Sequence, residues 1–177
     1  ILFPTEAKRK KARRVVLNLG GIANLTVLHD NPERVFGFDT GPANAPIDRL
    51  ARVCSKGKYD FDPDGKLARK GKIDEALVKK LLREDAFIRR LPPKSTGTES
   101  YGEPFVKKLL KSKKSFDALA CATEFVARSI AISLETFVSR GEALEIVVAG
   151  GGTQNKFLIE RLREAVQPSK VTISDDY

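Results

Sequence analysis

The sequence predicts an α/β protein with a mixed sheet and flanking helices. Three β-like segments lie between residues 15 and 38, and a mostly helical region follows them. A later β-like segment, residues 145–149, runs through three glycines into a helix and then into a strand candidate at residues 170–173. Because strand, helix and strand in succession form a βαβ unit, the end of the chain predicts two parallel strands.

The first strands are separated by an unusual turn. Residues 15–19 and 24–28 are apolar and rich in β-branched side chains, and Gly-Gly-Ile-Ala lies between them where a tight hairpin would carry Asn-Gly or Asp-Gly. A third candidate, residues 34–38, ends just before Asp39. Pro46 fits the first turn of a helix that continues over residues 47–54.

The middle of the chain predicts turns and helices. Residues 60–65, DFDPDG, look like the start of a calcium loop, but Gly71 takes the twelfth position where that loop needs Glu, so a solvated turn is expected. Asp74 is a good N-cap for a helix over residues 75–83. Prolines and glycines make residues 91–104 a loop rich in hydroxyl groups. Further helices are expected over residues 105–110, over residues 116–139 with Gly141 as C-cap, and over residues 155–166.

Composition restricts the classes of function. The chain of 177 residues has 41% hydrophobic and 31% charged residues, which is typical of one soluble globular domain. Its first residues have too little apolar length for a secretory signal. Cys54 and Cys121 are far apart, which favours buried thiols in a reducing compartment. The single histidine, His29, is placed at a hairpin tip, which argues against a Ser-His-Asp triad or a His-rich zinc site.

The net charge of +9 allows two interpretations. Basic clusters at residues 8–14 and 107–114 could face a nucleic acid or a phosphate. Alternatively they are a solvated lysine-rich surface, since acidic residues are interspersed along the expected helices. No aromatic RNA-binding motif or zinc knuckle accompanies the charge, so the solvated surface is favoured.

The turn EIVVAGGGTQN, residues 145–155, is the strongest candidate for ligand binding. A strand that opens through Gly150, Gly151 and Gly152 into a helix offers bare backbone and a helix N-terminus to an anion. It is not a dinucleotide fingerprint, because Asn155 stands where the third glycine belongs, and no Gly-Lys-Ser/Thr follows for a Walker loop. The alternative is a tight turn that needs only flexible backbone.

Two earlier stretches are also candidates. In LNLGGIANLTV the amides around Gly20 and Gly21 could wrap a phosphate, or the stretch could be a bulged hairpin whose Asn18 and Asn24 bond local backbone. Asp39, expected at the C-terminal end of its strand, could serve as a general base or could cap the Thr-Gly-Pro turn through an Asx bond. Spacing leaves both alternatives open.

Together these stretches resemble a known family. In order, NLGGIANLTVL, GFDTGPANAPID, PPKSTG and VVAGGGTQN resemble the anhydro-N-acetylmuramic acid kinase family of the sugar kinase, Hsp70 and actin superfamily. The resemblance implies an actin-like ATPase (ribonuclease H-like) domain. It covers nearly the whole chain but only about the C-terminal half of the family pattern, whose Gly-Thr-Ser-x-Asp-Gly stretch is absent here. We therefore expect residues 1–14 to be the basic remnant of a preceding region and residues 15–177 to be the C-terminal lobe.

The resemblance also implies roles. ATP and Mg²⁺ would be the cofactors, and 1,6-anhydro-N-acetylmuramic acid would be opened by water and phosphorylated on O6 in cytoplasmic peptidoglycan recycling. Asp39 would be the base that activates the water. The implied cofactor-binding residues are Gly20, Gly21, Asn24, Gly150, Gly151, Gly152 and Asn155, and the implied substrate-binding residues are Thr40, Gly41 and Asn44. No metal ligand is assigned.

The expected partners are the amino sugar, the missing N-terminal lobe and a second copy in a homodimer, with neither nucleic acid nor membrane. The alternative is a non-catalytic nucleotide-binding module of the same superfamily. Pro46 departs from the aliphatic residue expected at its position and should perturb the start of its helix.

Overall fold

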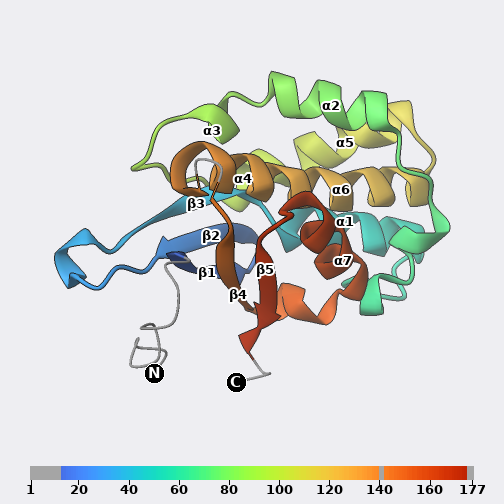
Figure 1. Cartoon of the computed structure of the whole chain (residues 1–177). Helices are drawn as coiled ribbons and strands as arrows, with labels where there is room; N and C mark the ends of the chain where they lie inside the picture. Colours follow the sequence, from blue (N-terminus) through green and yellow to red (C-terminus); the bar gives the residue numbers. More distant parts are fainter. Residues whose placement is uncertain (1–12, 140–141, 175–177) are drawn as a thin grey trace.

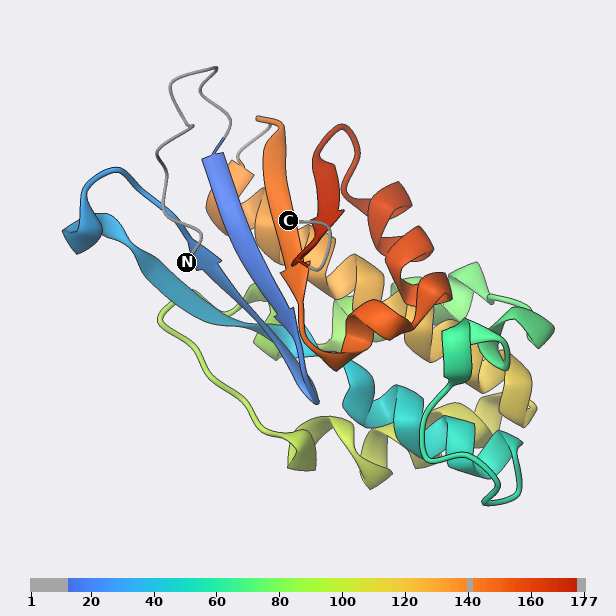
Figure 2. The ribbon, with the colours of Figure 1, turned by 90° about the horizontal axis from the view of Figure 1, so that it is seen from below.

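The computed structural model describes residues 13–139 and 142–174. Its strands form one five-stranded sheet in the order β3-β2-β1-β4-β5 (Figures 1 and 2). The strands are β1 (Arg13–Leu19), β2 (Ile22–Val27), β3 (Phe36–Pro42), β4 (Leu144–Ala149) and β5 (Lys170–Ile173). Strands β1, β2 and β3 pair antiparallel, whereas β4 pairs parallel with both β1 and β5. The expected mixed sheet and the βαβ unit at the end of the chain are confirmed.

The helices follow the expected order with additions. They are α1 (Asn44–Cys54), α2 (Glu75–Glu84), α3 (Ala86–Arg89), α4 (Thr98–Tyr101), α5 (Glu103–Ser112), α6 (Ser115–Leu134) and α7 (Lys156–Ala165). Shorter 3₁₀ turns are η1 (Pro32–Arg34), η2 (Pro63–Gly65), η3 (Ala68–Lys70) and η5 (Gly151–Gln154), and α6 continues as a π-helical turn, η4 (Glu135–Ser139). Asp74 caps α2 as expected, because its carboxylate accepts from the amide of Leu77 at 2.9 Å. The expected C-cap Gly141 lies outside the described residues.

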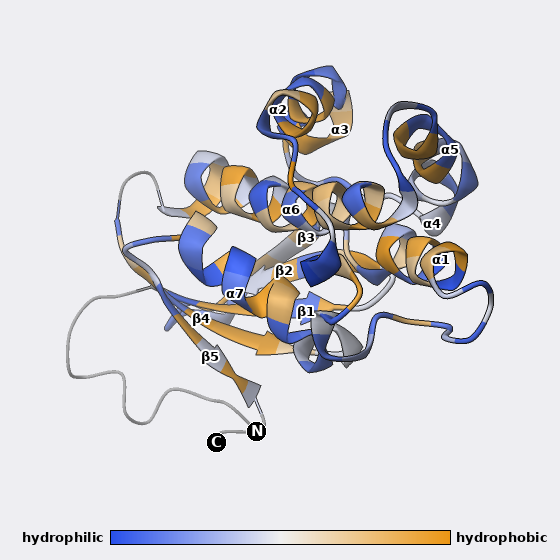
Figure 3. Ribbon diagram, turned by 90° about the vertical axis from the view of Figure 1, so that its right-hand side faces the viewer, coloured by the Kyte–Doolittle hydropathy of each residue, from blue (hydrophilic) through white to orange (hydrophobic). Residues whose placement is uncertain are grey.

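The described helices gather over one face of the sheet (Figures 1 and 3). Along β1 the side chains of Val15, Leu17 and Leu19 are fully buried, while the residues between them are only partly buried. This alternation results from the two-residue period of a strand, which points every second side chain at the helices. Helix α6 is the centre of the helical layer, because it is buried on almost all sides and contacts α1, α2, α7 and β3.

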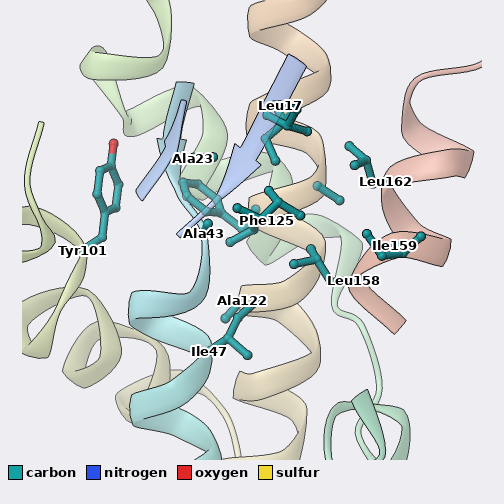
Figure 4. Close-up of a cluster of buried hydrophobic side chains, with 14 of the residues drawn as sticks. Leu17, Ala23, Ala43, Ile47, Tyr101, Ala122, Phe125, Leu158, Ile159 and Leu162 are labelled. Atoms are coloured by element: carbon teal, nitrogen blue, oxygen red, sulfur yellow. The ribbon is translucent and has the colours of Figure 1, made fainter. Parts of the chain in front are cut away.

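The core forms where α6 meets the sheet, α1 and α7. Figure 4 shows Phe125 of α6 between Leu17 of β1, Ile47 of α1 and Leu158 of α7. All four side chains are fully buried. The core therefore joins the first strand to the last helix and makes the two ends of the chain one unit.

Three sequence-based expectations were wrong in detail. Strand β3 does not end before Asp39 but continues to Pro42, because its residues still pair with β2 across a bulge at Ala23 and Asn24. The region 91–104 is not all loop, since it contains α4 and the start of α5. Helix α3, just before it, was not expected.

The DFDPDG stretch is not a solvated turn throughout. Asp62 is buried at 3% exposure, and its carboxylate accepts from the amides of Leu67 and Ala68 at 2.8 and 3.0 Å. Burial nevertheless raises the pKa of Asp62. The segment is thus a turn that folds around the buried carboxylate of Asp62. It packs against α7, where Gly65 lies close to Phe157.

The packing around Phe125 leads to a first prediction. Phe125→Ala should lower the free energy of unfolding by about 3–5 kcal/mol, because it leaves a cavity where α6 meets the sheet. Urea denaturation followed by circular dichroism measures this. The matched control is Phe61→Ala, which changes a side chain that is 56% exposed and should shift stability by no more than about 0.5 kcal/mol. Equal losses in the two variants would contradict this account of the core.

Candidate functional site

Polar side chains line up across three strands. In the sheet register Asp39 of β3 lies opposite Asn24 of β2, and Asn24 lies opposite Asn18 of β1. Directly opposite residues of neighbouring strands point to the same face of a sheet. All three are partly buried, and they alternate with the residues that face the helices. The sheet thus carries a polar row on the face away from α6.

The side chain of Asp39 is held by a loop from far along the chain. Its Oδ2 accepts from the hydroxyl of Ser95 at 2.8 Å and from the amide of Thr96 at 2.9 Å. The amide of Asp39 donates to the carbonyl of Lys94 at 3.1 Å. Figure 2 shows the segment between α3 and α4 running along β3. These bonds, rather than an Asx turn over Thr-Gly-Pro, fix the carboxylate.

Lys94 anchors that loop and was not among the expected site residues. It is 5% exposed, and its Nζ donates to the carbonyls of Phe87 and Ile88 at 3.1 and 2.8 Å. The same nitrogen lies 5.6, 4.8 and 5.0 Å from the ring centres of Phe38, Phe87 and Phe137. Burial lowers the pKa of Lys94 to about 8. A lysine just after two prolines gave no sequence signal of this role.

The hairpin turn is joined to the start of α1. The amide of Asn44 donates to the carbonyl of Gly20 at 2.9 Å, and the amides of Ala43 and Ala45 donate to the carbonyl of Gly21 at 3.0 and 3.1 Å. These carbonyls satisfy donors that a helix start leaves without intrahelical partners. Pro46 lies in the same first turn, where the backbone N–H has no intrahelical partner to lose. The expected perturbation of the helix start is therefore not seen.

The second glycine turn lies against the first. Gly150 has φ +89°, and a Cβ there would lie 2.5 Å from Oδ1 of Asn18. A Cβ at Gly152 would lie 2.5 Å from the Cβ of Leu19, whereas a Cβ at Gly151 would have only Nδ2 of Asn44 within 4 Å, at 3.9 Å. Packing therefore requires glycine at positions 150 and 152. Gly151 is exposed to open space, so packing does not explain the third glycine.

Asn44 bridges the two glycine turns. Its Nδ2 donates to the carbonyl of Leu19 at 3.1 Å, and its Oδ1 is close to Gly152. The resemblance implied a substrate-binding role for Asn44, and in the structure its side chain lies between the end of β1 and η5.

Other expected site residues are buried. Thr40 is fully buried, and its hydroxyl donates to the carbonyl of Ala23 at 3.2 Å. Gly41 is buried against Ser129 of α6. Asn155 is 6% exposed, and its Oδ1 accepts from the amide of Leu158 at 3.0 Å as the N-cap of α7. In the structure these three residues therefore make hydrogen bonds and packing contacts within the domain.

A groove of about 730 Å³ begins beside the hairpin turn, between α1, α4 and α5. It is lined by Gly21, Ala45, Asp48, Arg49, Arg52, Val53, Lys56, Gly57, Asp60, Thr98, Glu103, Val106, Lys107 and Leu110. Asp39, Asn18 and Asn24 are not among these residues, whereas Gly21 of the hairpin turn is. Burial, and secondly the charge of Asp62, raise the pKa of Asp48 to about 6.

Within residues 13–139 and 142–174, no three His, Cys, Asp or Glu side chains cluster closely enough to hold a metal ion. In the same residues no helix is both long and apolar enough to cross a membrane. Cys54 and Cys121 are free thiols; Cys121 is buried as expected, whereas Cys54 is only partly buried.

The fold first defines a class of protein. Xylulose kinase from Rhodospirillum rubrum superposes with a TM-score of 0.50 at 15% identity, covering 93% of this chain and 35% of that chain. The activator of 2-hydroxyisocaproyl-CoA dehydratase from Clostridium difficile, solved with bound ADPNP, gives a TM-score of 0.50 at 18% identity, covering 92% and 54%. The expected actin-like ATPase fold is therefore confirmed.

The family follows from sequence. A model of the anhydro-N-acetylmuramic acid kinase family matches residues 4–177, so the chain belongs to this family. Anhydro-N-acetylmuramic acid kinase from Synechococcus elongatus is 39% identical over 174 residues, which cover 93% of this chain and 45% of that relative. The enzyme of the same name from Salinibacter ruber is 42% identical over 172 residues, covering 93% and 43%. The chain thus spans less than half the length of the curated relatives that it matches.

The raised pKa of Asp48 leads to a second prediction. Between pH 3.8, the usual pKa, and about 6, the folded protein binds more protons than the unfolded chain, so the contribution of Asp48 to stability falls as pH rises through this window. Asp48→Asn removes this cost. The variant should melt above the parent at pH 7.5, and the difference should close below pH 4.

Differential scanning calorimetry at several pH values measures the effect. Asp60→Asn is the matched control, because the Asp60 carboxylate lines the same groove but is 77% exposed and pairs with Arg52 at the surface. A gain for Asp48→Asn that is independent of pH would show that burial of the charge is not its cause.

Proposed function

We propose that the protein containing this chain is an ATP-dependent kinase that converts 1,6-anhydro-N-acetylmuramic acid to N-acetylmuramic acid 6-phosphate in peptidoglycan recycling. Family membership supports the reaction class. The observation that carries the proposal is that one oriented carboxylate, Asp39, shares a polar row with Asn18 and Asn24, and that the glycine turn at Gly150 lies against Asn18 at the other end of this row. The turns would hold a nucleotide, and the carboxylate would act beside them.

Asp39 is the general base in this proposal. It takes a proton from water, and the water oxygen forms a bond to the anomeric carbon of the sugar. The bond from that carbon to O6 breaks, O6 takes the γ-phosphoryl group, and ADP leaves. The chain's own residues contribute mostly by positioning and by accepting this proton, which is the usual division of work in phosphoryl transfer.

The residues present fit a nucleotide. Gly151 is exposed, points into open space and has no packing reason to be glycine, whereas its neighbours fit only without side chains. Gly21 is likewise exposed at the hairpin turn. Bare backbone of this kind allows close approach of phosphate oxygens. Mg²⁺ would neutralise phosphate charge and would be held largely by the phosphates, since the described residues offer no cluster of acidic ligands.

The N-terminal lobe implied by the length of the relatives would supply the opposite wall of the cleft. We further propose the amino sugar as substrate, a cytoplasmic location, as recycling requires, and a homodimer. Residues 1–14 would be the remnant of the preceding region, of which Arg13 and Arg14 already belong to β1, and residues 15–177 would be the C-terminal lobe. The second candidate function is a nucleotide-binding module without catalysis, which would use the same exposed glycine turns.

Nucleotide binding is tested at Gly151. Gly151→Val should weaken ATP binding at least tenfold, because the new side chain would occupy the space in front of the turn. Its melting temperature should stay unchanged, since a Cβ at this position meets nothing closer than 3.9 Å. Isothermal titration calorimetry with ATP measures the first effect and thermal unfolding the second. Unchanged ATP affinity would contradict the proposal that the nucleotide binds at this turn.

Catalysis is tested at Asp39. In a coupled ADP-release assay on the protein at the length of its relatives, Asp39→Asn should lower sugar-dependent turnover by about 10²- to 10⁴-fold, because the amide cannot accept the proton. ATP affinity should be retained. Asp30→Asn, a change of an exposed acid between β2 and β3, is the matched control and should turn over normally. No turnover in the parent with ATP still bound would favour the non-catalytic module.

A further inference from the structure

The two oxygens of the Asp39 carboxylate are in different environments. Oδ2 accepts hydrogen bonds from the hydroxyl of Ser95 and the amide of Thr96, at 2.8 and 2.9 Å. Within residues 13–139 and 142–174, Oδ1 accepts no hydrogen bond. Two donors on one oxygen restrict rotation of the carboxylate about the Cβ–Cγ bond of Asp39. The free oxygen therefore has one fixed direction, and a proton acceptor benefits from this because orientation is a large part of catalysis.

The donors themselves are held in place from behind. Ser95 is exposed and Thr96 only partly buried, so neither has enough packing to be rigid by itself. The preceding residue, Lys94, is almost completely buried, with its Nζ bonded to two carbonyls of α3 and enclosed by three phenylalanine rings. Its carbonyl also accepts from the amide of Asp39. Lys94 thus ties the loop both to α3 and to β3.

A neutral side chain could fill this site at less cost. Burying an ammonium group without a carboxylate partner is unfavourable, and the lowered pKa of Lys94 reflects this. The carbonyls of Phe87 and Ile88 and the ring faces offset part of the cost. What the lysine secures is the path of residues 94–96 along the edge of β3.

We propose that Ser95 is a positioning residue for Asp39, and that Lys94 is the anchor that holds Ser95 and Thr96 in register with β3. The hydroxyl of Ser95 and the amide of Thr96 hold Oδ2, and Oδ1 is left to take the proton from water. Neither Ser95 nor Lys94 contacts the reacting atoms. This inference rests on the proposed role of Asp39 as base.

Activity tests the role of Ser95. In the ADP-release assay, Ser95→Ala should lower kcat by about 10- to 100-fold, the value of one hydrogen bond to a charged group, while the KM for the sugar and the affinity for ATP change less than twofold. Ser95→Thr keeps the hydroxyl and should restore most of kcat. A rise in KM with unchanged kcat, or no rescue by threonine, would overturn the proposal.

A double variant separates positioning from general damage to the loop. If Ser95 acts only through Asp39, Asp39→Asn/Ser95→Ala should be no slower than Asp39→Asn alone. If the fold-loss of kcat in the double variant equals the product of the two single-variant losses, Ser95 acts independently of Asp39, and the inference is overturned. If Asp39→Asn alone remains active, the proposed base fails. If Asp39→Asn is inactive but Ser95→Ala is normal, only the positioning role fails.

Hydrogen exchange tests the anchor without any assay of turnover. The Thr96 amide should exchange slowly in the parent chain, because it donates to Asp39, and it should exchange at least tenfold faster in Lys94→Met. The matched control is Lys108→Met, which changes an exposed lysine paired with Glu84 on the helical layer. Unchanged protection of Thr96 in Lys94→Met would show that the loop holds its position without the lysine.

Discussion

The attachment of the hairpin turn to the start of α1 is the interaction on which the rest of the arrangement depends. The carbonyls of Gly20 and Gly21 accept from three successive amides at the start of the helix. This leaves α1 without need of a side-chain cap and brings Asn44 against the end of β1 and η5. The two glycine turns, which are about 130 residues apart in the chain, are neighbours because β1 and β4 pair with Asn18 opposite Ala149, and the attachment of α1 places Asn44 between them.

The second constraint is that the helical layer packs on only one face of the sheet in the described residues. The strands separate their side chains accordingly, with apolar residues toward α6 and Asn18, Asn24 and Asp39 on the other side. A polar row would be costly inside the core, where each amide and carboxylate would need a partner. Its position on the face away from α6 leaves these side chains only partly buried and so lowers this cost.

Asp39 illustrates how the site combines distant parts of the chain. Its backbone belongs to β3, its carboxylate is held by Ser95 and Thr96, and the loop that carries them is anchored by Lys94 in a cage of phenylalanines from three different segments. Orientation of the carboxylate is thus a property of the packed domain. A carboxylate on an edge strand can therefore have a fixed orientation although it is only partly buried.

Local patterns in the sequence determined the strands, the mixed sheet, the cap at Asp74 and both glycine turns, because alternation, capping and turn chemistry act over a few neighbouring residues. The motifs of the chain also sufficed to recognise its family. The continuation of β3 through Asp39 and the burial of Thr40 and Asp62 were decided only by tertiary structure. The same holds for Lys94, because its cage, its carbonyl partners and the carboxylate that its loop supports are remote in sequence and meet only when β3, α3 and η4 pack together.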